Sequence, residues 1–212
     1  MLVADVMQAP VLTVTRKTTL PEAMRLVQHR GIRHLPVVED ETLVGIVSDR
    51  DLKRAMASPA TSLEAHELRY LLDAVTMDEI MTRAIITIGR MFPIEEAARL
   101  MVKEKVSALP VTEQGRLIGI VTETDVLELF VRGMGAGKPS SRIDVRLPED
   151  TATLADLVHA VEHAGVAISS IMTLGDRSGH KDVVIRVPTM DPRAAVTSLQ
   201  LRGYAVRDPR MG

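Results

Sequence analysis

The pattern of apolar and polar positions repeats itself within the first 130 residues of the chain. A shift of 74 residues aligns two copies without a gap from residue 6 to residue 130. Of the 51 paired positions, 16 are identical, and many of the others exchange one aliphatic residue for another. Self-similarity at a fixed spacing is the sequence signature of a duplicated structural unit. The sequence therefore predicts two consecutive copies of one small fold.

Each copy predicts the element order β-α-β-β-α. A short apolar stretch is followed by a helix whose apolar residues recur at helical spacing from Leu20 onward. Thr19 and Glu22 form a capping box at its start, whereas the second copy has Pro93 in place of the threonine. A strand hairpin comes next, and a final helix begins at Ser48 or Thr122. The expected strands are 11–14, 35–38 and 43–47 in the first copy and 85–88, 109–112 and 117–121 in the second.

The pattern changes after Phe130. A glycine-rich stretch at 132–141 has the composition of a flexible linker. Beyond it, alternation and helical spacing predict the order β-α-β-β-α-β, a split βαβ sandwich. The expected strands are 143–147, 166–174, 182–187 and 204–206, and the expected helices are 153–163 and 192–201.

The predicted fold class is therefore α/β (α+β). Thr61 and Glu64 form another capping box, which predicts a connecting helix that ends near Leu72. We expect the first copy at 1–60, the connecting helix at 61–76, the second copy at 77–131, the linker at 132–141 and a further domain at 142–212.

Composition narrows the function classes. Lys and Arg total 26 and Asp and Glu total 28, a net charge of −2 that argues against nucleic acid and against a polybasic membrane anchor. Two Tyr and two Phe leave few platforms for stacking bases, and the absence of Cys removes thiol chemistry. No apolar stretch is long enough to span a membrane, and the first residues do not read as a signal peptide. We therefore expect a cytoplasmic protein.

Two motifs occur in register in both copies. Leu-Pro-Val at 35–37 and 109–111 is followed by Gly-Ile-Val-Ser-Asp-Arg-Asp at 45–51 and Gly-Ile-Val-Thr-Glu-Thr-Asp at 119–125. These motifs resemble those of tandem CBS domains. The element order of residues 141–208 resembles an ACT domain, and the combination is similar to the acetoin-utilisation accessory protein family.

The resemblance implies two CBS units packed about a pseudo-twofold axis, with two grooves between them. In the family these grooves take AMP, ADP or ATP, and in some members S-adenosylmethionine or a dinucleotide. It also implies a regulatory protein that is no enzyme and requires no cofactor, that forms a homodimer and that controls a partner protein. The alternatives are a dimerisation scaffold with empty grooves and an amino-acid sensor that uses the ACT-like domain.

The spacing Ser48-x-x-Asp51, repeated at Thr122 and Asp125, has two interpretations. A hydroxyl and a carboxylate three residues apart cap a helix by satisfying its open backbone N–H groups. A carboxylate one turn into a helix also accepts hydrogen bonds from the hydroxyls of a ribose. The two roles can coexist in the ligand-free protein, and the resemblance favours the ribose role for at least one groove.

Basic residues differ between the copies. Arg33, His34 and Arg50 suit phosphate binding, although a solvated basic surface is the alternative. The second copy has Ser107, Ala108 and Thr124 at these positions, so we expect unequal grooves with most phosphate-binding charge from the first copy. Ile46 and Ile120 are expected to form apolar walls for the adenine ring, and the alternative is that they are ordinary strand core. Val106 is a further candidate for ligand binding, and the backbone of Val11 to Thr13 and of Ile85 to Thr87 is expected to contact the ligand.

Three further patterns point to no separate chemistry. The run Gly133 to Lys138 departs from a phosphate-binding loop, because Arg132 and Pro139 replace the required Gly and Ser or Thr. His159 and His163 lack a third ligand, so we expect no metal site. The ACT-like loop, Leu147 to Thr151, lacks the family's Gly and carries two acids, which favours a structural or dimerising role over amino-acid binding.

Overall fold

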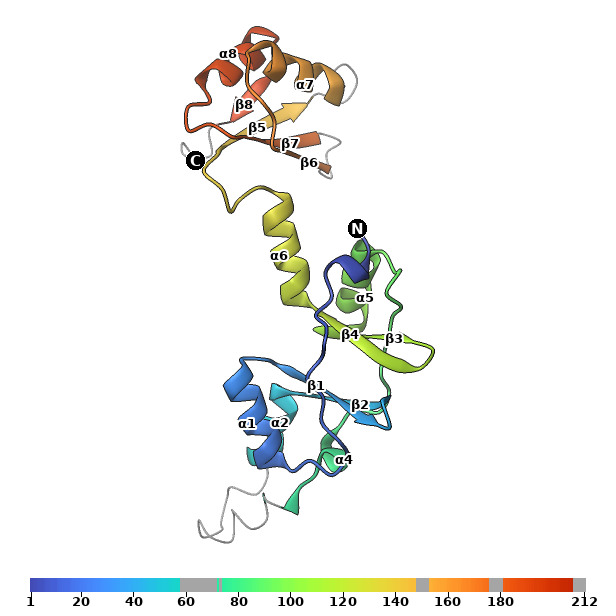
Figure 1. Ribbon diagram of the computed structural model, residues 1–212. Helices are drawn as coiled ribbons and strands as arrows, with labels where there is room; N and C mark the ends of the chain where they lie inside the picture. The colour runs from blue at the N-terminus through green and yellow to red at the C-terminus, as the bar shows by residue number, and fades with distance from the viewer. Residues whose placement is uncertain (58–71, 73, 148–152, 176–180, 208–212) are drawn as a thin grey trace. The chain divides into compact units, whose positions relative to one another are not determined.

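The computed structural model describes residues 1–57, 72, 74–147, 153–175 and 181–207. They belong to two compact units, an N-terminal unit of Met1–Val126 and a C-terminal unit of Leu127–Gly212 (Figure 1). Most of the expected connecting helix, including its capping box at Thr61 and Glu64, lies outside the described residues, as does the stretch 148–151 of the ACT-like loop. Among the described residues, no helix is long and apolar enough to cross a membrane.

The N-terminal unit contains the two predicted repeats, and the predicted helices and hairpins are confirmed in both. The first consists of η1 (Val3–Asp5), α1 (Leu20–Arg30), β1 (His34–Glu39), β2 (Thr42–Ser48) and α2 (Asp49–Ala57). The second consists of α4 (Met77–Ile80), α5 (Ile94–Glu104), β3 (Ala108–Glu113), β4 (Arg116–Thr122) and α6 (Glu123–Gly133), which continues into the C-terminal unit.

The two hairpins form one antiparallel sheet in the order β1-β2-β4-β3. Both turns have two residues with positive φ, Asp40 and Glu41 in the first and Gln114 and Gly115 in the second. Positive φ at both central positions matches the right-handed twist of the strands that such a turn joins. The inner strands pair at Thr42 and Arg116, so the sheet is symmetric about the junction of the two repeats.

The predicted strands 11–14 and 85–88 are wrong as strands. Each forms only one parallel bridge, Val14 with Val37 and Ile88 with Val111. The backbone N–H of Val14 donates to the carbonyl of Pro36, and that of Val38 donates to the carbonyl of Val14. Pro36 has no N–H with which to continue this ladder, and Pro110 has the same place in the second repeat. A single bridge is therefore as far as each ladder extends.

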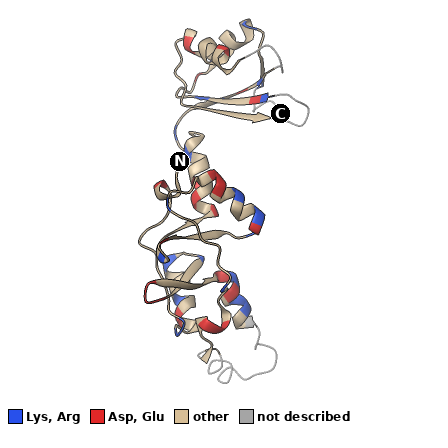
Figure 2. Cartoon of the chain, turned by 90° about the vertical axis from the view of Figure 1, so that its right-hand side faces the viewer, with Lys and Arg blue, Asp and Glu red and all other residues tan. Residues whose placement is uncertain are grey.

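Aliphatic side chains form the core of the first repeat. Leu35 and Val37 of β1 are fully buried, and they belong to one cluster with residues of α1, β2, α2 and α4. The capping box at α1 is present, since the backbone N–H of Thr19 donates to Glu22 at 2.9 Å. Charges of both signs are interspersed on the helices around this core (Figure 2).

The C-terminal unit has the predicted order β-α-β-β-α-β. The elements are β5 (Ser141–Leu147), α7 (Leu154–His163), β6 (Ser170–Gly175), β7 (Lys181–Val187), α8 (Arg193–Leu201) and β8 (Ala205–Arg207). The sheet is antiparallel in the order β6-β7-β5-β8, and α7 and α8 cover one face of it (Figure 1). The strand expected at 166–174 begins only at residue 170.

Candidate functional site

Two pockets in the N-terminal unit are lined by both repeats. We call them groove A, of about 500 Å³, and groove B, of about 290 Å³. Groove A is lined by the start of α6 in the second repeat and by residues 30–34 of the first. Groove B is lined by the start of α2 in the first repeat and by residues 105–108 of the second. Each groove therefore combines the helix start of one repeat with the strand entry of the other.

This exchange follows from how the repeats cross. Gln8, which precedes the first repeat's helices, pairs with Ile120 of β4 through backbone hydrogen bonds of 2.9 and 3.1 Å. Thr82, its counterpart after the 74-residue shift, pairs with Ile46 of β2 through bonds of 2.9 and 3.1 Å. Gly119 permits the first crossing, because a Cβ there would lie 2.6 Å from the Sδ of Met7. Backbone geometry therefore places residues 8 and 82 in equivalent positions.

The capping interpretation of the Ser/Thr-x-x-Asp motif is confirmed in both repeats. Both the backbone N–H and the Oγ of Ser48 donate to Oδ2 of Asp51, at 2.9 and 2.6 Å. The N–H and Oγ1 of Thr122 donate to Oδ2 of Asp125 at 2.7 and 2.6 Å. These bonds hold each carboxylate in a defined orientation at its helix start. These hydrogen bonds use only Oδ2 of each carboxylate. The other oxygen, Oδ1, is the one that can accept a hydrogen bond from a ligand.

The two Oδ1 atoms differ. Asp51 lines groove B, and its Oδ1 has no hydrogen-bond partner among the residues that the structure describes. Asp125 is only 8% exposed and does not line groove A. Its Oδ1 accepts a hydrogen bond of 2.7 Å from Nε2 of Gln8. Oδ1 of Asp51 in groove B therefore has no partner among the described residues, whereas the equivalent oxygen of Asp125 is occupied by Gln8.

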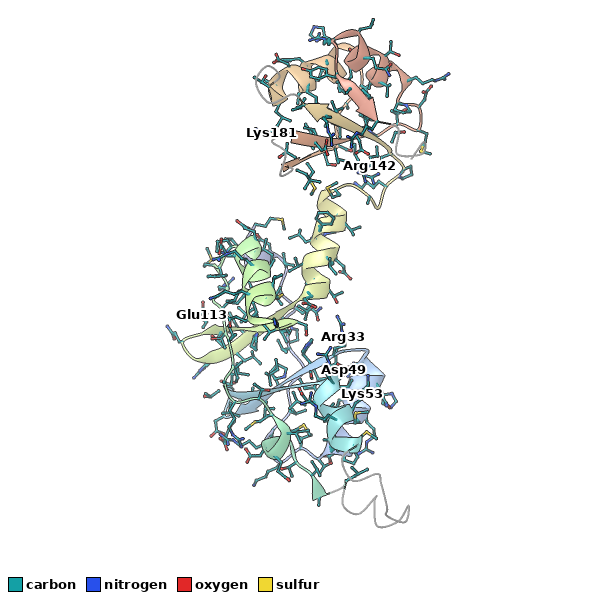
Figure 3. All side chains as sticks on the ribbon, turned by 180° about the vertical axis from the view of Figure 1, so that it is seen from behind. Arg33, Asp49, Lys53, Glu113, Arg142 and Lys181 are labelled. Carbon is teal, nitrogen blue, oxygen red and sulfur yellow. The ribbon has the colours of Figure 1, made fainter. Side chains whose placement is uncertain are left out.

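The expected group of basic residues is divided between the grooves. Arg33 and His34 line groove A, where the guanidinium of Arg33 donates to Oγ1 of Thr124 at 2.7 Å (Figure 3). Arg50 lines groove B instead, together with His34, which lines both grooves, so Arg50 and Arg33 do not face the same groove. Each groove combines the helix start of one repeat with the strand entry of the other. The strand entry at Arg33 and the helix start at Arg50, both from the first repeat, therefore face different grooves.

Sequence reasoning also missed basic residues of groove B. Arg54 and Lys105 line it together with Arg50, and none of the three forms an ion pair with a described residue. Arg54 lies one helical turn after Arg50, a spacing that places both on one face of α2. That spacing was a usable signal, whereas Lys105 comes from the other repeat.

Most expected apolar and strand-entry residues line a groove. Ile120 lines groove A and Ile46 lines groove B. Thr13 and Thr87 line neither, although their neighbours do. The neighbours are Val11 and Leu12 in groove A and Ile85 and Ile86 in groove B, where Val106, Ser107 and Ala108 also lie.

His34 connects the grooves, since it lines both and its Nε2 lies 2.8 Å from Oγ of Ser107. Burial lowers the pKa of His34 from its ordinary value, and repulsion by Arg33 lowers it further, against the opposing attraction of Asp49, Glu123 and Asp51. The native state therefore binds fewer protons at this site than the unfolded state does.

From this shift we expect a pH-dependent loss of stability. The contribution of His34 to the free energy of unfolding is fully present above the unfolded pKa of about 6.5. This contribution is lost as the pH falls through that value toward the lower native pKa. Urea midpoints of wild type and His34→Gln at pH 7.5 and pH 5 measure it. The variant should lose less stability than wild type between the two pH values, and equal losses would contradict this assignment.

Comparison with known proteins places these repeats in a family. The model of the CBS domain matches residues 3–58 and 77–132. A CBS domain-containing protein from Dictyostelium discoideum is 36% identical over 142 residues, which are 66% of this chain and 98% of that protein. A homoserine O-acetyltransferase from Methanosphaerula palustris is 35% identical over 62% of this chain, but the match spans only 24% of that enzyme.

Solved structures show the same pair of repeats. A CBS domain pair in complex with 5′-methylthioadenosine and S-adenosyl-L-methionine is 31% identical, with a TM-score of 0.53, and covers 65% of this chain and 98% of its own. CBSX2 in complex with AMP is 29% identical, with a TM-score of 0.53, over 62% and 97%. A Vibrio cholerae protein described as the acetoin utilization protein AcuB is 29% identical, with a TM-score of 0.55, over 65% and 95%.

Proposed function

Because this chain belongs to the CBS domain family, we propose that it is a regulatory protein that binds an adenosine-containing ligand in groove B. The observation that carries the proposal is Oδ1 of Asp51, an oriented carboxylate oxygen without a partner among the described residues, at the wall of a pocket. A buried or half-buried oxygen whose lone pairs accept no hydrogen bond favours a ligand that donates one. The two hydroxyls of a ribose are such donors.

The other walls of groove B fit the rest of an adenosine nucleotide. Ile46, Ile85 and Ile86 provide aliphatic surface for a purine ring. Arg50, Arg54 and Lys105 provide positive charge without a carboxylate partner among the described residues, which suits phosphate. Solved relatives bind AMP in one case and 5′-methylthioadenosine with S-adenosyl-L-methionine in another, which supports the adenosine part. The cations favour AMP, ADP or ATP over an uncharged nucleoside.

A thermal-shift screen of the full chain tests this function. We expect AMP, ADP or ATP to raise the melting temperature by several degrees, since ligand at a hundred times its Kd stabilises the native state by about 2.7 kcal/mol. S-adenosylmethionine and adenosine are included to rank phosphate against other substituents, and GMP is the control for the base. If no adenosine compound shifts the melting temperature, the grooves are empty and the scaffold alternative holds.

For the C-terminal unit we propose an ACT-like role in self-association. Its element order and its sheet order β6-β7-β5-β8 match those expected of a ferredoxin-like split βαβ sandwich, which supports this proposal. In the proposed scheme this unit joins two copies into a homodimer, and ligand binding in groove B changes how the protein acts on a regulated partner. The similarity to AcuB makes acetoin utilisation the first pathway in which to look for that partner. The expected setting is the cytoplasm.

A further inference from the structure

Gln8 distinguishes the two grooves in a way that charge does not. It lies at the position of Thr82 after the 74-residue shift. The backbone of Gln8 forms two hydrogen bonds with Ile120 of the second repeat, and that of Thr82 forms two with Ile46 of the first. The backbones are therefore equivalent, and only the side chains differ. The longer Gln8 reaches Oδ1 of Asp125 at 2.7 Å, whereas Thr82 forms no hydrogen bond with Asp51.

The surroundings of the two carboxylates reflect this contact. Asp51 is half-buried and lines groove B, whereas Asp125 is 8% exposed and does not line groove A. Groove A is nevertheless the larger pocket, so its lack of an accessible carboxylate does not result from lack of space. The amide of Gln8 donates to the atom that a ribose hydroxyl would otherwise reach.

We propose that Gln8 acts as a built-in substitute for ribose, which closes groove A to adenosine ligands and leaves groove B as the one open site. This inference rests on the proposed function, because it assumes that Asp51 and Asp125 are equivalent ribose acceptors. A ligand that enters groove A must first break a hydrogen bond to a charged group. From the usual strength of such bonds, the resulting affinity is roughly 10- to 150-fold weaker than in groove B.

A reciprocal exchange at positions 8 and 82 tests the proposal by calorimetry with AMP on the full chain. Wild type should bind one equivalent tightly. Gln8→Thr should gain a second equivalent, and Thr82→Gln should weaken the single site at least tenfold, because the new amide can reach Asp51. Adding Asp125→Ala to Gln8→Thr should remove the gained equivalent.

The outcomes separate this inference from the proposed function. If wild type binds one equivalent and neither Gln8→Thr nor Thr82→Gln changes binding, the role of Gln8 is overturned and the proposed function stands. Two equal sites in wild type also overturn it. If wild type binds nothing but Gln8→Thr binds one equivalent, groove B is wrongly assigned and the role of Gln8 holds. If neither wild type nor any variant binds AMP, both proposals are wrong. Gln8→Ala replaces Gln8→Thr in these experiments if Gln8→Thr does not fold.

Discussion

Replacing Asp51 by alanine is expected to weaken AMP binding by at least about tenfold, and by more than a hundredfold if the carboxylate accepts from both ribose hydroxyls. Each hydrogen bond to a charged group contributes about 1.5–3 kcal/mol. The carboxylate is already oriented by two hydrogen bonds from Ser48, so the protein does not have to order it when the ligand binds. Isothermal titration of the full chain with AMP measures the loss.

Asp49→Ala is the matched control for charge. Asp49 lies two residues earlier on α2, does not line groove B, and its carboxylate is held by Lys53 at 3.0 Å (Figure 3). Both substitutions remove one negative charge from the same helix start. We expect Asp49→Ala to bind AMP within about twofold of wild type, since its carboxylate does not line the groove and is paired with Lys53. Equal losses in the two variants would contradict the ribose role.

A second control separates binding from helix capping. Asp51→Ala also removes the acceptor for the N–H of Ser48, which costs about 1 kcal/mol of stability in typical caps. Asp51→Asn keeps an oxygen acceptor without the charge, so its affinity should lie between those of wild type and Asp51→Ala. Normal AMP affinity in a folded Asp51→Ala protein would remove the basis of the proposed function.

The helices and hairpins were predictable because their signals are local. The Leu-Pro-Val strands, the polar turns and the capping spacing at Ser48 each depend on residues a few positions apart, and duplication showed each signal twice. The apolar stretch at 11–14 was mistaken for a strand because its strand propensity is real. Pro36, 22 residues after Val14, has no N–H, and this limits the pairing of the stretch with β1 to one bridge. The apolar pattern of residues 11–14 does not show which strand they will pair with, so this limit was not predictable.

The composition of each groove was not predictable from the repeat alone. The 74-residue shift shows which residues are equivalent, but it does not show which repeat supplies each wall. Arg33 and Arg50 are close in sequence and were assigned together, yet the crossing at Gln8 and Thr82 directs them to different grooves. The contact of Gln8 with Asp125 spans 117 positions, a separation at which sequence spacing carries no information.

Leu35→Ala is expected to have the largest effect on stability, a loss of about 2–5 kcal/mol in the N-terminal unit. Leu35 is fully buried in β1, and its truncation leaves a cavity in the cluster that also contains Leu20, Val47 and Leu52. Since whole domains are stable by only about 5–15 kcal/mol, such a loss should leave much of this unit open to solvent exchange. Hydrogen exchange followed by mass spectrometry reports the change peptide by peptide.

Leu157→Ala is the control, because Leu157 is equally buried but belongs to the core of the C-terminal unit. The two clusters draw their described residues from different units, so each truncation removes contacts from only one of them. Leu35→Ala should speed exchange in β1, β2 and α2 and weaken AMP binding, since Asp51 is held by that repeat. Leu157→Ala should speed exchange in α7 and β7 and leave AMP affinity unchanged. A Leu35→Ala protein that exchanges as slowly as wild type in β1 would mean that this side chain does not support the groove.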